Sequence, residues 1–257
     1  MRIPSALTAV LLLAVGLTGC GDDESPDTTP TPSAASPAAG PEPGARDELA
    51  GLAAVALDRR YAALYTLSDG GTSREVVAAV AEDGGWRVDI PAGALGGTAG
   101  VTVIRVANGL YQCTLSTPAA PVSPTCVRVA EKGDRVPRRY DPRIQRLFRQ
   151  WLTVFTDQKS PLAVSAVQPL EGAEGACYAV DSVTAASDPP VDVGIYCYSE
   201  DGLLTAARVG FGTLKLVRQV AGPATLQLPG PEVAGQPMGI AEAPPVVVPP
   251  SLAPSAQ

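Results

Sequence analysis

The sequence predicts an α+β fold in which antiparallel strands are combined with helices. Two segments, 45–57 and 142–156, have the apolar spacing of amphipathic helices. Short runs rich in β-branched and aromatic residues fill the rest of the central chain, and Asp-Gly and Asn-Gly sequences separate several of them. The elements therefore follow one another in the order helix, sheet, helix, sheet.

The first helix, ARDELAGLAAVAL at 45–57, places Leu49, Leu52, Ala53 and Ala56 on one side. The turn sequences SDGG, EDGG and ANG come after it and favour hairpins, because these residues accept the positive φ of tight turns. This half is expected to be an antiparallel meander. Its expected strands are 60–67, 73–81, 85–91, 100–106, 110–115 and 125–130.

The second helix, at 142–156, has the most regular helical pattern in the chain. Asp141 is placed to cap its first turn, and Pro142 stands at the first helical position, where an N–H is not needed. The helix carries one wide apolar stripe and has arginines on its other faces. The stripe consists of Ile144, Leu147, Phe148, Trp151, Leu152 and Phe155. A second set of strands is expected at 162–168, 176–183, 192–199, 202–212, 213–220 and 224–229, with a glycine kink at 210–212.

The first twenty residues predict export and a lipid anchor. Arg2 precedes an apolar stretch at 6–17, which is too short to span a bilayer as a helix. The ending LTGC resembles the bacterial lipobox, in which cleavage leaves an acylated cysteine at the N-terminus. Residues 1–19 are therefore expected to be a lipoprotein signal peptide and Cys20 the attachment site of the lipid; an ordinary signal peptide cleaved elsewhere is the alternative.

Composition divides the remaining chain into three parts. Residues 20–44 hold the lipidated cysteine and a stretch of Asp, Pro, Ser and Thr with little to bury, which predicts a disordered tether. Residues 45–233 have the periodic patterns of a folded domain. Residues 234–257 are rich in proline, which cannot continue a sheet, so they are expected to form a disordered tail.

Several classes of function are disfavoured. The formal net charge of −7 argues against nucleic-acid binding. The chain has no histidine, which excludes Ser-His-Asp and Cys-His catalysis, and no motif indicates a metal or a cofactor. Carboxylates occur in the second half, but nothing identifies a catalytic pair, so no enzymatic activity is expected. These carboxylates are Asp181, Asp188, Asp192, Glu200 and Asp201.

The four cysteines other than Cys20 are expected to form disulfides in an oxidising compartment. They are Cys113, Cys126, Cys177 and Cys197, which allow three pairings. Pairing within each neighbouring pair of strands is favoured, Cys113 with Cys126 and Cys177 with Cys197. A metal site is the rival interpretation, although no C-x-x-C pair is present.

Taken together, the lipobox, the meander at 61–129, the helix at 143–157 and the closing stretch YCYSEDGLLTAARVGFGTLKL resemble actinobacterial lipoproteins of the LppX/LprG type. Uncharacterised streptomycete-type lipoproteins are similar in texture. The resemblance covers most of 45–230 and rests on element order. It implies a LolA-like fold, which is a curved antiparallel half-barrel whose concave side is covered by helices. It also implies binding of acylated molecules between sheet and helices, on the outer face of the cell membrane.

The expected function is therefore a membrane-anchored module that binds an acylated lipid, glycolipid or lipoprotein in an apolar groove. The helix at 142–156 would line this groove, or its stripe would simply pack as core. An envelope interaction or stress-sensing module is the alternative, in which an arginine cluster meets anionic headgroups or is only a solvated face. The expected groove residues are Ile144, Leu147, Phe148, Trp151 and Phe155. The arginine cluster consists of Arg135, Arg138, Arg139, Arg143, Arg146 and Arg149. The sequence does not indicate an oligomeric state.

Overall fold

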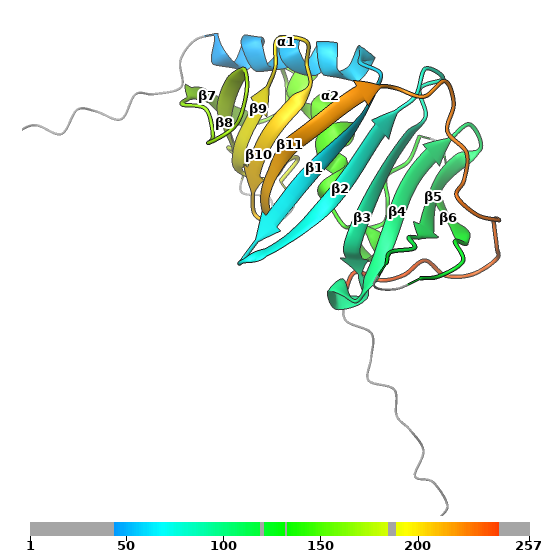
Figure 1. Ribbon diagram of the computed structural model, residues 1–257. Coiled ribbons are helices and arrows are strands. Elements are labelled where there is room, and N and C mark those ends of the chain that lie inside the picture. Colours follow the sequence, from blue (N-terminus) through cyan, green and yellow to red (C-terminus); the bar gives the residue numbers. More distant parts are fainter. Residues whose placement is uncertain (1–43, 119–120, 132, 185–188, 242–257) are drawn as a thin grey trace, which may run out of the picture. The chain divides into compact units, whose positions relative to one another are not determined.

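Strands dominate the computed structural model, which describes residues 44–118, 121–131, 133–184 and 189–241. All of these belong to one compact unit, 39–257. Within them the chain forms one open, eleven-stranded antiparallel sheet with two α-helices (Figure 1). The α+β prediction is confirmed at this level. The expected signal peptide, Cys20, the tether up to residue 43 and residues 242–257 lie outside the described residues.

The two expected sets of strands merge into a single sheet because the first and last strands pair. The order across the sheet is β6-β5-β4-β3-β2-β1-β11-β10-β9-β8-β7. At its centre β1 and β11 run antiparallel, with Tyr61 opposite Ala221. The strands are β1 (Tyr61–Asp69), β2 (Thr72–Val80), β3 (Trp86–Ala94), β4 (Ala99–Val106), β5 (Gly109–Thr114), β6 (Cys126–Ala130), β7 (Leu162–Val167), β8 (Ala176–Ser182), β9 (Gly194–Tyr198), β10 (Leu204–Val209) and β11 (Gly212–Ala221).

One face of the sheet, called here the inner face, packs against the helices and forms the main core. Strand β1 shows the pattern, since Tyr61, Ala63, Tyr65 and Leu67 are buried and alternate with less buried residues. The expected first helix is confirmed as α1 (Ala45–Asp58), whose buried residues join the same core. Helix α2 (Gln150–Thr156) contacts α1 and lies behind the central strands in Figure 1.

The prediction of one continuous helix at 142–156 is wrong. A 3-10 helix, η3 (Ile144–Phe148), is followed by α2, and Arg149 between them has φ −146° and ψ −55°. Arg143 has a positive φ of 68°, so no helix can start before it. Asp141 does accept the amide N–H of Arg143 at 2.8 Å, as a capping side chain would. Its second oxygen accepts a hydrogen bond from Nε of Arg146 at 2.8 Å, which favours the tighter, irregular backbone of this segment.

Two expectations about the C-terminal part are also wrong. Residues 224–229 form no strand, because both edges of β11 are already paired with β1 and β10. Residues 234–241 are packed instead of beginning a disordered tail. The amide of Met238 donates to the side-chain oxygen of Gln112 at 2.6 Å, and the amide of Ile240 donates to the carbonyl of Arg139 at 3.0 Å. The folded domain therefore continues past 233, at least to the last described residue of this segment.

The C-terminal segment, defined here as 222–241, connects several parts of the sheet. After β11 it crosses the outer face, where Leu226 and Leu228 pack on strands β4 to β6. It then runs beside β6, with the amide of Val233 donating to the carbonyl of Cys126 at 2.8 Å. Finally it reaches Gln112, whose side chain points to the inner face. The segment thus wraps round the β6 edge of the sheet.

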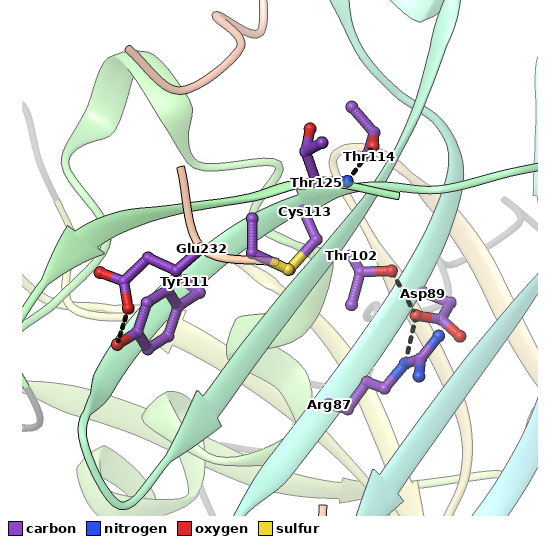
Figure 2. Close-up of a disulfide and its surroundings, with 9 residues drawn as sticks. Arg87, Asp89, Thr102, Tyr111, Cys113, Thr114, Thr125 and Glu232 are labelled. Carbon is purple, nitrogen blue, oxygen red and sulfur yellow. Dashed lines mark hydrogen bonds and ion pairs between the residues drawn. A yellow bond between two sulfur atoms is a disulfide. The ribbon is translucent and has the colours of Figure 1, made fainter. Parts of the chain in front are cut away.

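Two disulfides lie on the outer face, one near each end of the sheet. Cys113 is bonded to Cys126 across β5 and β6, and Cys177 is bonded to Cys197 across β8 and β9. These are the pairs favoured in the sequence analysis. Figure 2 shows the first of them between the Tyr111–Glu232 hydrogen bond and Asp89. Buried disulfides of this kind are typical of extracytoplasmic proteins.

Candidate functional site

The residues expected to line an apolar groove are part of the core. Their exposed fractions are at most 3%, and this holds for Ile144, Leu147, Phe148, Trp151 and Phe155. A cavity between this layer and the sheet, bordered by α1, β1, η3, α2, β9 and β10, has a volume of about 10 Å³. That volume holds no more than one water molecule. Of the two interpretations of the stripe, the structure shows core packing.

Aromatic contacts explain how the layer is filled. Trp151 meets the ring of Tyr196 edge to face at 5.9 Å, and Phe155 meets the same ring at 5.1 Å. Phe148 contacts Tyr65 on β1 at 5.2 Å. Edge-to-face contacts of this kind add stability beyond the area they bury. The stripe of the sequence is therefore matched by a row of tyrosines on the inner face of the sheet.

The arginine cluster does not form one continuous basic face. Arg143 forms an ion pair with Asp192 on the approach to β9, and Arg139 lies over the ring of Tyr140 at 4.4 Å. Arg146 pairs with the buried Asp141. The remaining members include Arg135 and Arg149, and together with Arg146 these line a pocket that also contains an arginine from the sheet.

This pocket, called here the arginine pocket, has a volume of about 360 Å³ and opens between the inner face and the 133–153 layer. Such a volume is within the range of small-molecule sites. The complete lining is Leu57, Trp86, Arg105, Leu110, Gly133, Asp134, Arg135, Val136, Gln145, Arg146, Arg149, Gln150 and Thr153. It combines apolar side chains with four guanidinium groups and one carboxylate.

The sheet supplies the floor of the pocket as one cross-strand row. Trp86 on β3 lies opposite Arg105 on β4, and Arg105 lies opposite Leu110 on β5. Residues that face each other across antiparallel strands project on the same side, so all three belong to the inner face. Arg105 continues the inward series of Val101 and Val103 on β4, where a charged residue is unexpected. Its Nη2 donates to the carbonyl of Gly84 at 2.8 Å.

The walls come from the loop at 133–136 and from the start of α2. Arg149 occupies the irregular position between η3 and α2 and donates from Nη1 to the carbonyl of Leu57 at 2.7 Å. Leu57 belongs to the last turn of α1, where unpaired carbonyls favour a cation. The kink at 149 thus points this guanidinium away from the apolar core and into the pocket lining.

The positive charges of the pocket are unevenly compensated. Among the described residues Arg146 has a carboxylate partner, Asp141, whereas neither Arg105 nor Arg149 has a carboxylate within 4.0 Å. Burial lowers the pKa of Arg105. Burial lowers the pKa of Arg149 as well, and the charges of Arg105 and Arg60 lower it further. The charges of Tyr61 and Asp58 partly oppose this lowering at Arg149. The pocket lining holds four guanidinium groups and one carboxylate, so its positive charge is only partly compensated.

The carboxylates considered in the sequence analysis do not meet in one cleft. Asp192 is paired with Arg143, Asp201 is paired with Arg59, and Asp188 lies outside the described residues. The carboxylate of the arginine pocket is Asp134, which is not one of these five. In the described part of the chain no group of three or more His, Cys, Asp or Glu side chains could hold a metal ion.

Sequence reasoning missed Arg105, Trp86 and Leu110, which carry the floor of the pocket. A signal was present, because Val101, Val103 and Arg105 alternate along one predicted strand and must share a face. An arginine on the apolar face of a strand is a candidate functional residue. The sequence did not show that Arg149 would lie beside this face of the sheet. That contact joins segments far apart in the chain.

None of the described helices is long and apolar enough to cross a membrane.

No family model and no curated protein matches the chain. Among solved structures, the crystal structure of MucB matches with 16% sequence identity and a TM-score of 0.38. This match covers 77% of the present chain and 65% of the MucB chain, which is less than two thirds of it. A match at this identity and TM-score assigns neither a family nor a function.

Proposed function

We propose that this protein is a lipid-anchored extracytoplasmic binding module with a LolA-like half-barrel domain of the LppX/LprG type, and that the arginine pocket holds part of an amphiphilic envelope molecule. The binding is non-covalent and involves no chemical step. The open antiparallel sheet, its helix-covered inner face and the two outer disulfides support an extracytoplasmic domain of this kind.

The observation that carries the proposal is the mixed lining of the pocket. Trp86, Leu57 and Leu110 offer apolar contact, while arginines lie beside them on the floor and wall. An amphiphile presents the same combination, an apolar part joined to a polar group. The filled space beneath the aromatic stripe moves the ligand from the groove expected in the sequence analysis to this pocket at the β3–β5 end of the inner face.

The binding proposal can be tested by native mass spectrometry of the protein purified from its own host. A co-purifying amphiphile is expected. Thr153 is exposed and lines the pocket, so Thr153→Trp should fill the pocket and remove the bound mass without disturbing the core. Thr225→Trp is the matched control, since Thr225 is exposed in the C-terminal segment and lies outside the pocket. Equal ligand in both variants, or none in the native protein, would refute the proposal.

The lipid anchor needs a separate test. Metabolic labelling with palmitate should mark the native chain, and Cys20→Ser should abolish the label. Globomycin should block processing of the native chain because it inhibits the signal peptidase of lipoproteins. Labelling that survives Cys20→Ser would place the lipid elsewhere.

The alternative of an envelope interaction or sensing module stays a prediction. Its basis in the sequence was the arginine cluster, and the structure pairs Arg143 and Arg146 with carboxylates instead of leaving them on one exposed face. Liposome binding that weakens on Arg138→Ala or Arg139→Ala, and not on changes in the pocket, would favour this alternative over the pocket.

A further inference from the structure

The arginine pocket contains two guanidinium groups, of Arg105 and Arg149, that form no ion pair with a carboxylate of the described residues. Arg149 and Arg105 lie on different elements, the η3–α2 junction and β4, and were brought together by folding. Each has a bond to a backbone carbonyl, of Leu57 and Gly84 respectively. One such bond uses a single N–H of the five that a guanidinium carries. Neither guanidinium group makes a second hydrogen bond within the described part of the chain, so its remaining N–H groups could donate to a ligand.

Two other arginines of the 133–149 region have acidic partners. Arg143 and Arg146, which also lie next to the core, are each paired with a nearly buried aspartate, Asp192 and Asp141. For these two arginines the folded chain supplies an acid that is itself nearly buried. In the pocket, Arg105, Arg135 and Arg149 face one carboxylate, Asp134. Part of this positive charge is left for a ligand to neutralise.

We infer that Arg105, Arg135 and Arg149 form an anion site that takes the phosphate group of an amphiphile, whose apolar part packs on Trp86 and Leu110. This rests on the proposed function, because it names the polar group of the molecule held in the same pocket. Phosphate fits better than carboxylate for two reasons. It offers more oxygen acceptors, and as a monoester it carries up to two negative charges against several guanidinium groups.

Trp86 gives a direct readout of the site. The chain has two tryptophans, and Trp151 is fully buried in the core, so Trp151→Phe leaves Trp86 as the reporter. The full chain carrying Cys20→Ser and Trp151→Phe would be titrated with hexyl phosphate, hexanoate, hexyltrimethylammonium and inorganic phosphate, each followed by Trp86 fluorescence. Cys20→Ser removes acyl chains that would compete for the pocket.

Hexyl phosphate should bind best and inorganic phosphate more weakly, because the hexyl chain adds contact with Trp86. Arg149→Gln and Arg105→Gln should each weaken hexyl phosphate binding about 10- to 100-fold. Arg218→Gln removes the same charge from an exposed position on β11 and should change the affinity less than twofold. Because Arg149 also holds the end of α1, melting curves of each variant are recorded, and Arg105→Gln provides the second test.

Each contrary result points to a different failure. Equal binding of hexyl phosphate, hexanoate and hexyltrimethylammonium would overturn the anion site and leave amphiphile binding intact. Hexanoate binding as tightly as hexyl phosphate would overturn the choice of phosphate. Inorganic phosphate binding as tightly as hexyl phosphate would keep the anion site and refute the amphiphile. No response of Trp86 to any probe, or binding unaffected by both pocket variants in folded protein, would overturn the assignment.

Discussion

Replacing Trp151 by alanine tests whether the layer formed by η3 and α2 is core or the wall of a groove. The Trp151 side chain has an exposed fraction of 0% and contacts Tyr196 at 5.9 Å and Phe211 at 6.3 Å. Removing a buried indole of this kind costs about 3–5 kcal/mol of unfolding free energy. The indole N–H has no hydrogen-bond partner among the described residues, so its loss adds no further cost.

Trp151→Phe is the matched control. It keeps an aromatic ring against Tyr196 and leaves a smaller cavity than alanine does, so the loss of unfolding free energy should be well below that of Trp151→Ala. Both variants would be unfolded in urea with circular dichroism as the probe and the disulfides oxidised. The melting temperature of Trp151→Ala should fall by roughly 10 °C, at about 2–4 °C for each kcal/mol in a domain of this size.

A small loss of stability in Trp151→Ala would contradict core packing. If Trp151→Ala lost less than about 1 kcal/mol, and an added lipid stabilised the native chain but not the variant, Trp151 would line an open groove. The expectation derived from the sequence would then hold and the packing described above would be wrong. A large loss without any ligand dependence supports core packing.

Three other changes test separate parts of the fold. Replacing Cys113 and Cys126 together by serine should lower the unfolding free energy by about 3 kcal/mol, since the disulfide closes a loop with a sequence separation of 13. The variant lacks this disulfide, so a reductant cannot lower its unfolding free energy by breaking that bond. Gly202→Ala should cost several kcal/mol in thermal unfolding, because Gly202 has a φ of +78° and the new Cβ would lie 2.5 Å from the amide nitrogen of Ala56, whereas Gly51→Ala on the open side of α1 should not destabilise. Burial raises the pKa of Tyr198 far above its usual value near 10. The unfolded chain therefore loses this proton first. The contribution of Tyr198 to stability is fully present below pH 10 and decreases by about 1.4 kcal/mol for each pH unit above it. Urea titrations at pH 9 to 11 would show the decrease, and a flat profile would contradict the burial.

The local features of the fold could be predicted because they depend on neighbouring residues. The turn sequences at 68–71 and 82–85 place glycines where the backbone has positive φ, at Gly70, Gly71 and Gly84. The alternation along β1 and β4 fixed which residues would share a face. The pairing of β1 with β11 joins segments about 150 residues apart in the chain, and no local pattern encodes that contact.

The prediction of one continuous helix at 142–156 was wrong for a related reason. The apolar spacing from Ile144 to Phe155 fits both a helix and the observed broken path, because the stripe records which side faces the core and not how regular the backbone is. The break depends on Asp141 and on the distant Asp192, which hold Arg146 and Arg143. Polar contacts of this range cannot be read from periodicity.

The candidate site contains one arginine that the sequence pattern indicated and one that it did not. Arg149 was noticed in the sequence as one member of a basic stretch, whereas its neighbour in space, Arg105, belongs to a strand some 40 residues earlier. The contrast between paired and unpaired arginines, on which the anion site depends, exists only in the folded molecule. Composition alone pointed the other way, since the chain as a whole is acidic.

The C-terminal segment has a practical consequence for shortened versions of this protein. The amide of Val233 donates to the carbonyl of Cys126, and Leu226 and Leu228 pack on the apolar cluster that contains the Cys113–Cys126 disulfide. A chain that stopped after β11 would expose both the β6 edge and the apolar side chains beside it. Unprotected strand edges pair with one another, so such a truncation should form oligomers and fibrils, and expression vectors should retain residues to at least 241.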